Sequence, residues 1–419
     1  MTSSVPEWIN ESFFEKVLRT SNGDKNLNIS EFNVAPSNNS QEHYASTIFK
    51  ATVKYANKFN CEEVTKLLIK LVVPKAIAFS DENSFDTELN MYLSTLPDLQ
   101  RLLNQNGENV QFAPKLLYSS KDPVPLLVLE DVTMNGYDNT TGPLDLFGIK
   151  CVTSKLAKFH AASIYIDRDV MIQNYHTHLY SFSHFKGKEV SYYKNGLFNL
   201  KSRDGLNFMK NNMYLFVDEL KSWRGYDECT DKMKNIAKKF EELGEKVYQA
   251  NPSADGFNVL NHGDFCYNNM LFKKDDDGKV CDVLFVDYQM TKWGSPCIDL
   301  YYLLHLVASR EVSENHRDEI ISYYYEELVK SLKDIGYMTK PPNMLDLNVE
   351  LLKNGFLEVL IAVCFMPFMF MDPKIHDTEL AFENGIEGLL LRQDLYRNPE
   401  FKTFIKKLLP KFLHKGLLF

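Results

Sequence analysis

The chain has 419 residues, of which 44% are hydrophobic, 13% aromatic and 25% charged, a composition typical of a folded globular protein and not of a disordered one. Its 47 basic and 56 acidic residues give a net charge of −9, so the protein as a whole repels polyanions. We therefore expect no nucleic-acid partner. The length suits one two-lobed unit or two domains that share a cleft.

Three features bear on the cellular location. Residues 1–20 contain neither a basic leader nor an uninterrupted apolar run, so we expect no secretory signal. The most apolar stretch, residues 355–371, carries Glu358 and Pro367 and is interpreted as a core helix, not as a membrane span. The cysteines are scattered without a C-x-x-C pair, which is typical of reduced thiols. We expect a cytoplasmic protein without stable membrane insertion.

The first third of the chain predicts a sheet with one long helix laid across it. A short helix at residues 6–19 is followed by a mostly polar stretch, residues 20–40, which is interpreted as a loop. Strict alternation from Ile48 predicts a half-buried strand, and the run LLIKLVV at 67–73 predicts a buried one. A helical stripe beginning at Phe85 and ending near Pro97 follows, and then come strands at 112–120 and 125–132.

The remainder is predicted to be mainly helical, with helices at 151–163 and 316–336. Two short β-rich segments are joined by the turn DDDG at 275–278. We expect an N-lobe of residues 1–133 and a C-lobe of residues 134–419.

The segment HGDFCYNNMLFKKDDDGKVCDVLFVDYQ, residues 262–289, holds Asp264, Asn269 and Asp287. Asp264 and Asn269 lie on one loop, and a hairpin then returns the chain so that Asp287 ends close to them. Phosphoryl transfer needs such a cluster, because magnesium takes protein and phosphate oxygens while a separate carboxylate orients the attacking hydroxyl. The spacing is the kinase arrangement, with Asp264 as base and Asn269 and Asp287 on magnesium. The alternative is an ordinary turn followed by a helix-capping aspartate.

A kinase also needs a lysine on a buried strand and a glutamate on a helix to pair with it. Lys70 and Glu88 fit these roles, since burying a lysine among apolar residues is costly without a counter-ion. Two alternatives stay open: Lys70 on an edge strand with its ammonium in solvent, and Glu88 as an ordinary exposed helix residue.

Over nearly its whole length the chain resembles the ecdysteroid kinase-like family, also called choline-kinase-like, within the aminoglycoside phosphotransferase superfamily. The matching motifs are the phosphate loop EHYAS (42–46), LLIKLVVP with Lys70, FDTELNMYLSTLP with Glu88, the hinge LVLEDV (127–132), LAKFHAAS (156–163), and HGDFCYNN with FVDYQ. The resemblance implies an α+β, two-lobed protein-kinase-like fold that uses ATP and Mg2+.

The resemblance assigns further residues. It implies that the backbone of Glu130 and Val132 faces adenine, that Asp299 braces the catalytic loop, and that His262 orients this loop without acting as a base. Asp299 as a plain helix cap is the alternative. One departure is Gln41, which stands where such families usually place glycine, so the approach of the backbone to the phosphates is expected to be looser.

The sequence favours a small-molecule acceptor. It reads Asp-Tyr-Gln where protein kinases have Asp-Phe-Gly, and it has no downstream Ala-Pro-Glu. The aromatic-rich region 164–250 and the helix at 355–371 suit a hydrophobic alcohol such as a steroid better than choline, although core packing is the alternative for these side chains. The lysine-rich tail, residues 401–419, either docks on the C-lobe or contacts a membrane.

Three functions remain open at this stage: a kinase for small hydrophobic alcohols, a choline, ethanolamine or aminoglycoside kinase, and a catalytically weak nucleotide-binding scaffold. The intact set of charged residues argues against the scaffold, whereas Gln41 keeps it open. The sequence makes no prediction of oligomeric state.

Overall fold

The computed structural model describes residues 4–37, 46–59, 61–72, 83–139, 142–173, 193–194, 196–199, 202–251, 256–372 and 374–419, and for 168–173 the backbone alone. Gln41 and most of the predicted phosphate loop lie outside these ranges.

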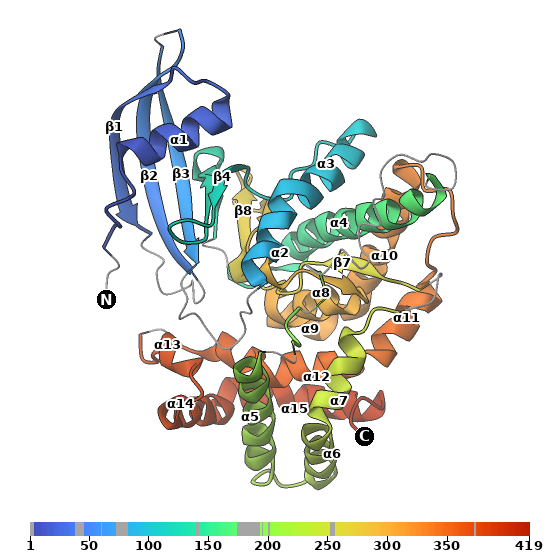
Figure 1. Ribbon diagram of the computed structural model, residues 1–419. Coiled ribbons are helices and arrows are strands. Elements are labelled where there is room, and N and C mark those ends of the chain that lie inside the picture. Colours follow the sequence, from blue (N-terminus) through green and yellow to red (C-terminus); the bar gives the residue numbers. More distant parts are fainter. Residues whose placement is uncertain are drawn as a thin grey trace.

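The N-terminal lobe is an antiparallel sheet crossed on one face by helix α1 (Glu11–Asn22), as Figure 1 shows. Asn10 caps this helix by accepting a hydrogen bond from the Phe13 amide, and Phe14 is buried against the sheet. The sheet order is β1 (Asn28–Pro36), β2 (Ser46–Ala56), β3 (Glu62–Val72), β5 (Leu126–Glu130) and β4 (Leu116–Ser120).

The prediction of a loop at 20–40 is wrong, because β1 occupies Asn28–Pro36. This strand lies at the edge of the sheet and pairs with β2 alone. Most of its residues are exposed, and its register shifts between Ile29 and Glu31. An edge strand that is exposed on both faces lacks the alternating apolar pattern that a sequence reading needs.

The helix that carries Glu88 is longer than predicted. It runs through α2 (Ser84–Asn90), the π-helix η1 (Met91–Thr95) and α3 (Leu96–Gln105). Pro97 therefore does not end the helix but lies in the first turn of α3, directly after the π-helical turn. In the wider turn before it, the Leu96 amide bonds to the Met91 carbonyl.

The C-terminal lobe is mainly helical, and Figure 1 shows α4 and α10 lying side by side within it. Its helices are α4 (Leu146–Gln173), α5 (Arg203–Leu220), α6 (Asp227–Lys238), α7 (Phe240–Tyr248), α8 (Cys297–Tyr302), the π-helix η6 (Leu303–Val307), α9 (Arg310–Asn315), α10 (Arg317–Asp334), α11 (Met344–Lys353), α12 (Gly355–Cys364), η7 (Met366–Phe370), α13 (Thr378–Ala381), α14 (Ile386–Arg397) and α15 (Pro399–His414). The protein thus has the predicted α+β, two-lobed fold.

Short strands carry the predicted catalytic segment. Strand β7 (Val259–Asn261) pairs with β10 (Lys292–Gly294), and the hairpin β8 (Met270–Lys274) and β9 (Val280–Phe285) pairs with β6 (Tyr137–Asp138). Short 3-10 turns separate these strands: η2 (Val132–Asn135), η4 (Tyr267–Asn269) and η5 (Tyr288–Met290).

The apolar helix α12 and the apolar face of α15 both belong to the C-lobe core. Every residue of α12 is buried, and α15 buries Phe401, Phe404, Ile405, Leu408 and Leu409. Within the described residues no single helix is long and apolar enough to cross a membrane; α11 together with Gly355–Phe370 passes on length and composition but bends by 55°.

Candidate active site

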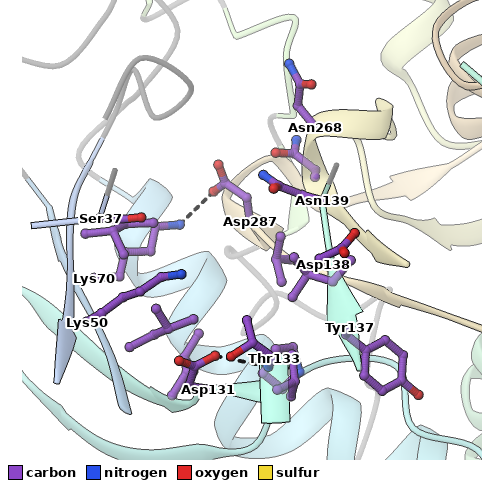
Figure 2. A pocket seen from close by; sticks show the side chains of 18 of the residues that line it. Ser37, Lys50, Lys70, Asp131, Thr133, Tyr137, Asp138, Asn139, Asn268 and Asp287 are labelled. Atoms are coloured by element: carbon purple, nitrogen blue, oxygen red, sulfur yellow. Dashed lines mark hydrogen bonds and ion pairs between the residues drawn. The ribbon is translucent and has the colours of Figure 1, made fainter. Parts of the chain in front are cut away.

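A cavity of about 300 Å³ lies between the sheet and the helical lobe. Its walls combine apolar side chains with charged ones, which Figure 2 shows from close by. The apolar contributors are Ile48, Leu68, Leu129, Val132, Leu271 and Val286, and the charged ones include Lys50, Lys70, Glu88, Asp131, Asp138 and Asp287. Such a cavity suits a ligand that has both an apolar part and charged groups.

Three predicted residues meet at one end of this cavity. Strand alternation turns Lys70 to the same face of β3 as Leu68, and the Lys70 Nζ lies 2.9 and 2.8 Å from the two carboxylate oxygens of Glu88. The same nitrogen lies 2.8 Å from Oδ1 of Asp287, which belongs to the other lobe (Figure 2). One ammonium therefore joins the sheet, the helix α2 and the C-lobe.

The Lys70 ammonium is held in its charged form. Its residue is only 9% exposed, and burial alone would lower the pKa. The carboxylates of Asp287 and Glu88 outweigh burial and raise the pKa of Lys70 above its ordinary value. Two carboxylates thus face one ammonium, and a bound cation would offset their negative charge beside a polyphosphate.

The loop that follows β7 brings Asp264 and Asn269 together. The Asn269 Nδ2 donates to the Asp264 carboxylate at 2.8 Å and to its carbonyl at 2.9 Å. Burial, and then the negative charge of Asp287, raise the pKa of Asp264 to about 7. A carboxylate with such a pKa can take up a proton near neutral pH.

A second aspartate fixes the backbone of this loop. Asp299 is fully buried at the first turn of α8, and its two oxygens accept hydrogen bonds from the amides of His262 at 2.7 Å and Gly263 at 2.9 Å. It therefore does more than the plain helix cap that the sequence left open. The His262 ring in turn lies 2.9 Å from the Val286 carbonyl, next to Asp287, and burial lowers the pKa of His262. A neutral ring that holds two backbone segments suits an orienting role.

The oxygen atoms around the cavity fit magnesium. Asp287 and Asn269 both line it and offer a carboxylate and an amide oxygen, the ligand types that a hard cation prefers. Among the described residues, no cluster of three or more His, Cys, Asp and Glu side chains is arranged to hold a metal. The protein ligands would thus be these two, with phosphate oxygens and water completing the shell.

The predicted hinge residues lie at one edge of the cavity. Val132 lines it, whereas Glu130 is absent from its described lining and its carboxylate instead accepts hydrogen bonds from Gln111 and the Lys115 amide. The proposed contact of both backbones with adenine stays a prediction.

Sequence reasoning missed two residues that bear on the site. It gave Lys50 no role, yet Lys50 lines the cavity and extends its amine into it in Figure 2. The pairing of Ile48 with Lys70 places Lys50 two residues further along the same face, and only this register reveals it. His160 was likewise missed; it is fully buried on α4 and contacts Asp299 at 3.2 Å. A polar residue in an apolar helix was the available signal.

Comparison with known proteins assigns the chain to a family. Residues 40–337 match the model described as the ecdysteroid kinase-like family. Similar solved structures include the GDP and kanamycin complex of APH(2")-IIia, with 12% identity and a TM-score of 0.38 over 92% of this chain and 99% of that one. Another is a choline/ethanolamine kinase family protein from Mesorhizobium loti, with 12% identity and a TM-score of 0.33 over 85% of this chain and 88% of that one. A search of curated proteins finds no match.

Proposed function

Because the chain belongs to the ecdysteroid kinase-like family, we propose that it is an ATP- and magnesium-dependent phosphotransferase whose acceptor is a hydroxyl group of a small molecule. The observation that carries this proposal is the contact of the Lys70 ammonium with both Glu88 and Asp287 at 2.8 Å, because it unites the two lobes where a polyphosphate would lie.

Each charged group then has one role. Lys70 holds the phosphate chain and is itself positioned by Glu88. Asp264 orients the acceptor hydroxyl and receives its proton as the new oxygen–phosphorus bond forms and the bond between the γ-phosphorus of ATP and the leaving ADP breaks. Asn269 fixes the Asp264 carboxylate through the 2.8 Å hydrogen bond. Asn269 and Asp287 would hold magnesium, which would neutralise charge on the phosphates.

The proposal extends to a hydrophobic alcohol as acceptor, with ecdysteroids as the family's namesake. Support comes from the family and not from the aromatic-rich region 164–250, since most of its described rings, among them Phe208, Phe216 and Phe240, are buried in the core. That outcome matches the packing alternative for these side chains. Residues 174–192 lie outside the described part. The lobe boundary at 133/134 and a cytoplasmic location are also proposed, the latter from the scattered free cysteines.

The test is magnesium-dependent ATP turnover against a panel of steroids, amino alcohols and plant phenolics. We expect wild-type protein to phosphorylate a hydrophobic alcohol, and Asp264→Asn to lower kcat by roughly 10²–10⁴-fold, the usual contribution of a positioned acid or base. Asp277→Asn, at the exposed β8–β9 turn, is the matched control.

Equal turnover by wild type and Asp264→Asn on every acceptor would refute the proposed role of Asp264. Turnover confined to amino alcohols would favour a choline or ethanolamine kinase instead.

A further inference from the structure

A second cavity of about 280 Å³ lies in the C-lobe, between η6, the start of α10 and the end of α15. The described residues that line it are all different from those lining the first cavity. Its lining includes His305, Arg317, Glu358, Lys411 and Lys415. A site here is therefore independent of the function proposed above.

The floor of this cavity is a buried ion pair. Arg317 Nη2 donates to Glu358 at 3.0 Å, and the His305 Nε2 lies 3.4 Å from the same carboxylate. Burial would raise the pKa of Glu358, but the hydrogen bond from His305 and the charge of Arg317 lower it to about 2. Glu358 is therefore ionised and can only accept hydrogen bonds, so the Nε2 of His305 carries the proton.

The other ring nitrogen, Nδ1, is buried without a hydrogen-bond partner among the described residues. His305 itself is only 3% exposed. A buried polar atom without a partner is unfavourable, and a hydroxyl group of a ligand can satisfy it because a hydroxyl both donates and accepts hydrogen bonds.

A second unpartnered atom lies in the same lining. Glu314 binds the Lys407 ammonium through Oε2 at 2.7 Å, while its Oε1 is buried with no partner in the described part of the chain. Hydroxyl groups of a ligand would satisfy both unpartnered atoms.

Two lysines lie at the rim of this cavity. Lys411 and Lys415 are one helical turn apart at the end of α15, and no described acid forms an ion pair with either. The four carboxylates of the lining are paired with other cations: Glu314 with Lys407, Asp318 and Glu358 with Arg317, and Glu319 with Lys150. Although much of Lys415 is exposed, partial desolvation of its ammonium and the facing Arg317 lower its pKa. An anionic group would relieve this repulsion.

We propose that this cavity is a binding site for a small hydroxylated anion, such as a phosphate monoester of a polyol. Its anionic group lies between Lys411 and Lys415, and its hydroxyl groups form a hydrogen bond with His305 and donate one to Glu314. Neither an anion without hydroxyl groups nor a neutral polyol satisfies both halves of the site.

The experiment uses glycerol 3-phosphate, inorganic phosphate and glycerol as probes, with dissociation constants measured by calorimetry on the full chain. We expect glycerol 3-phosphate to bind at least fivefold more tightly than either of the others. The double variant K411M/K415M should weaken it at least tenfold. K406M is the matched control, since its ammonium lies over the Trp223 ring elsewhere on α15.

A second variant tests the hydroxyl half. In Glu314→Gln, the amide oxygen stays with the Lys407 ammonium, and the amide nitrogen faces the cavity as a donor. The preference for glycerol 3-phosphate over phosphate should therefore fall. Equal binding of the two anions to wild type overturns the proposal. So does binding that K411M/K415M leaves unchanged, because the probe is then held elsewhere, such as at Lys70.

Discussion

The two walls of the cleft hold their charged groups by different means. On the N-lobe wall, Lys70 is fixed by side chains alone, through its ion pairs with Glu88 and Asp287. On the C-lobe wall, the loop carrying Asp264 is fixed through its backbone, since Asp299 accepts hydrogen bonds from the amides of His262 and Gly263.

Because of this difference, substitutions on the two walls should have different effects. An ion pair between side chains can lose one partner and leave the backbone in place, especially where another carboxylate remains. A buried carboxylate that satisfies backbone amides cannot be replaced so easily, because each amide loses its acceptor. Changes to the C-lobe wall should therefore cost both stability and turnover, and changes to the N-lobe wall mainly turnover.

The largest effect is expected from Asp299→Asn. The new amide turns a donor either toward the Gly263 N–H or toward both the His262 N–H and His160. Two charge-assisted hydrogen bonds weaken or disappear, which should lower the free energy of unfolding by about 3–5 kcal/mol and abolish most turnover. Urea denaturation and an ATP turnover assay measure both. If turnover falls while the unfolding midpoint stays constant, Asp299 acts in the chemistry and not on the loop backbone.

The next effect concerns the backbone itself at Gly263. Its φ is 86°, and a Cβ placed there would lie 1.9 Å from the Met290 carbonyl oxygen. Gly263→Ala should lower the free energy of unfolding by about 2–3 kcal/mol, from left-handed strain and from the displaced loop. Gly278→Ala is the matched control: its φ is 78°, but the Cβ meets no described atom within 4 Å.

The control should therefore cost only the conformational part, about 1–2 kcal/mol, and keep full turnover. Equal losses of stability and turnover in the two variants would show that the close approach to Met290 has no consequence.

On the opposite wall, Glu88→Gln should spare stability and reduce activity. Lys70 keeps Asp287 as a counter-ion, so the free energy of unfolding should fall by only about 1 kcal/mol. The lysine loses its fixed position, and kcat/KM for ATP should fall roughly 10–100-fold, or about 1.4–2.7 kcal/mol. Glu108→Gln, which removes a half-buried partner of Lys158, is the control. A large fall in the free energy of unfolding of Glu88→Gln would contradict the proposed difference between the two walls.

The sequence predicts those parts of the site that local chemistry dictates. A lysine inside LLIKLVV needs a counter-ion, and the helix that follows offers Glu88, so their proximity is predictable without coordinates. The spacing of Asp264, Asn269 and Asp287 across one hairpin is equally local.

The sequence does not specify the register of paired strands or the packing of residues that are far apart in the chain. Lys50 faces the cleft only because Ile48 pairs with Lys70, which alternation alone cannot specify. His160 reaches Asp299 across 139 positions of chain, and nothing near His160 in sequence indicates that partner. The edge strand β1 escapes detection because its exposed faces leave no periodic pattern.

The smallest effect concerns a residue that links the two walls. Tyr193 lies far from Glu88 in sequence, yet its hydroxyl accepts a hydrogen bond from the Asn90 Nδ2 at 2.6 Å and shares one of 2.7 Å with Thr95. Both partners follow Glu88 on the same continuous helix. Tyr193→Phe should lower the free energy of unfolding by about 1 kcal/mol and kcat/KM for ATP by a few-fold.

Tyr396→Phe is the matched control, because the Tyr396 hydroxyl donates to the Val363 carbonyl at 2.9 Å within the C-lobe core. It removes a buried tyrosine hydroxyl in the same way, so it should cost similar stability and leave kcat/KM unchanged. If the two variants reduce kcat/KM alike, loss of stability explains the effect. A reduction of kcat/KM that occurs only in Tyr193→Phe would mean that the N-lobe wall depends in part on a hydrogen bond from the opposite lobe.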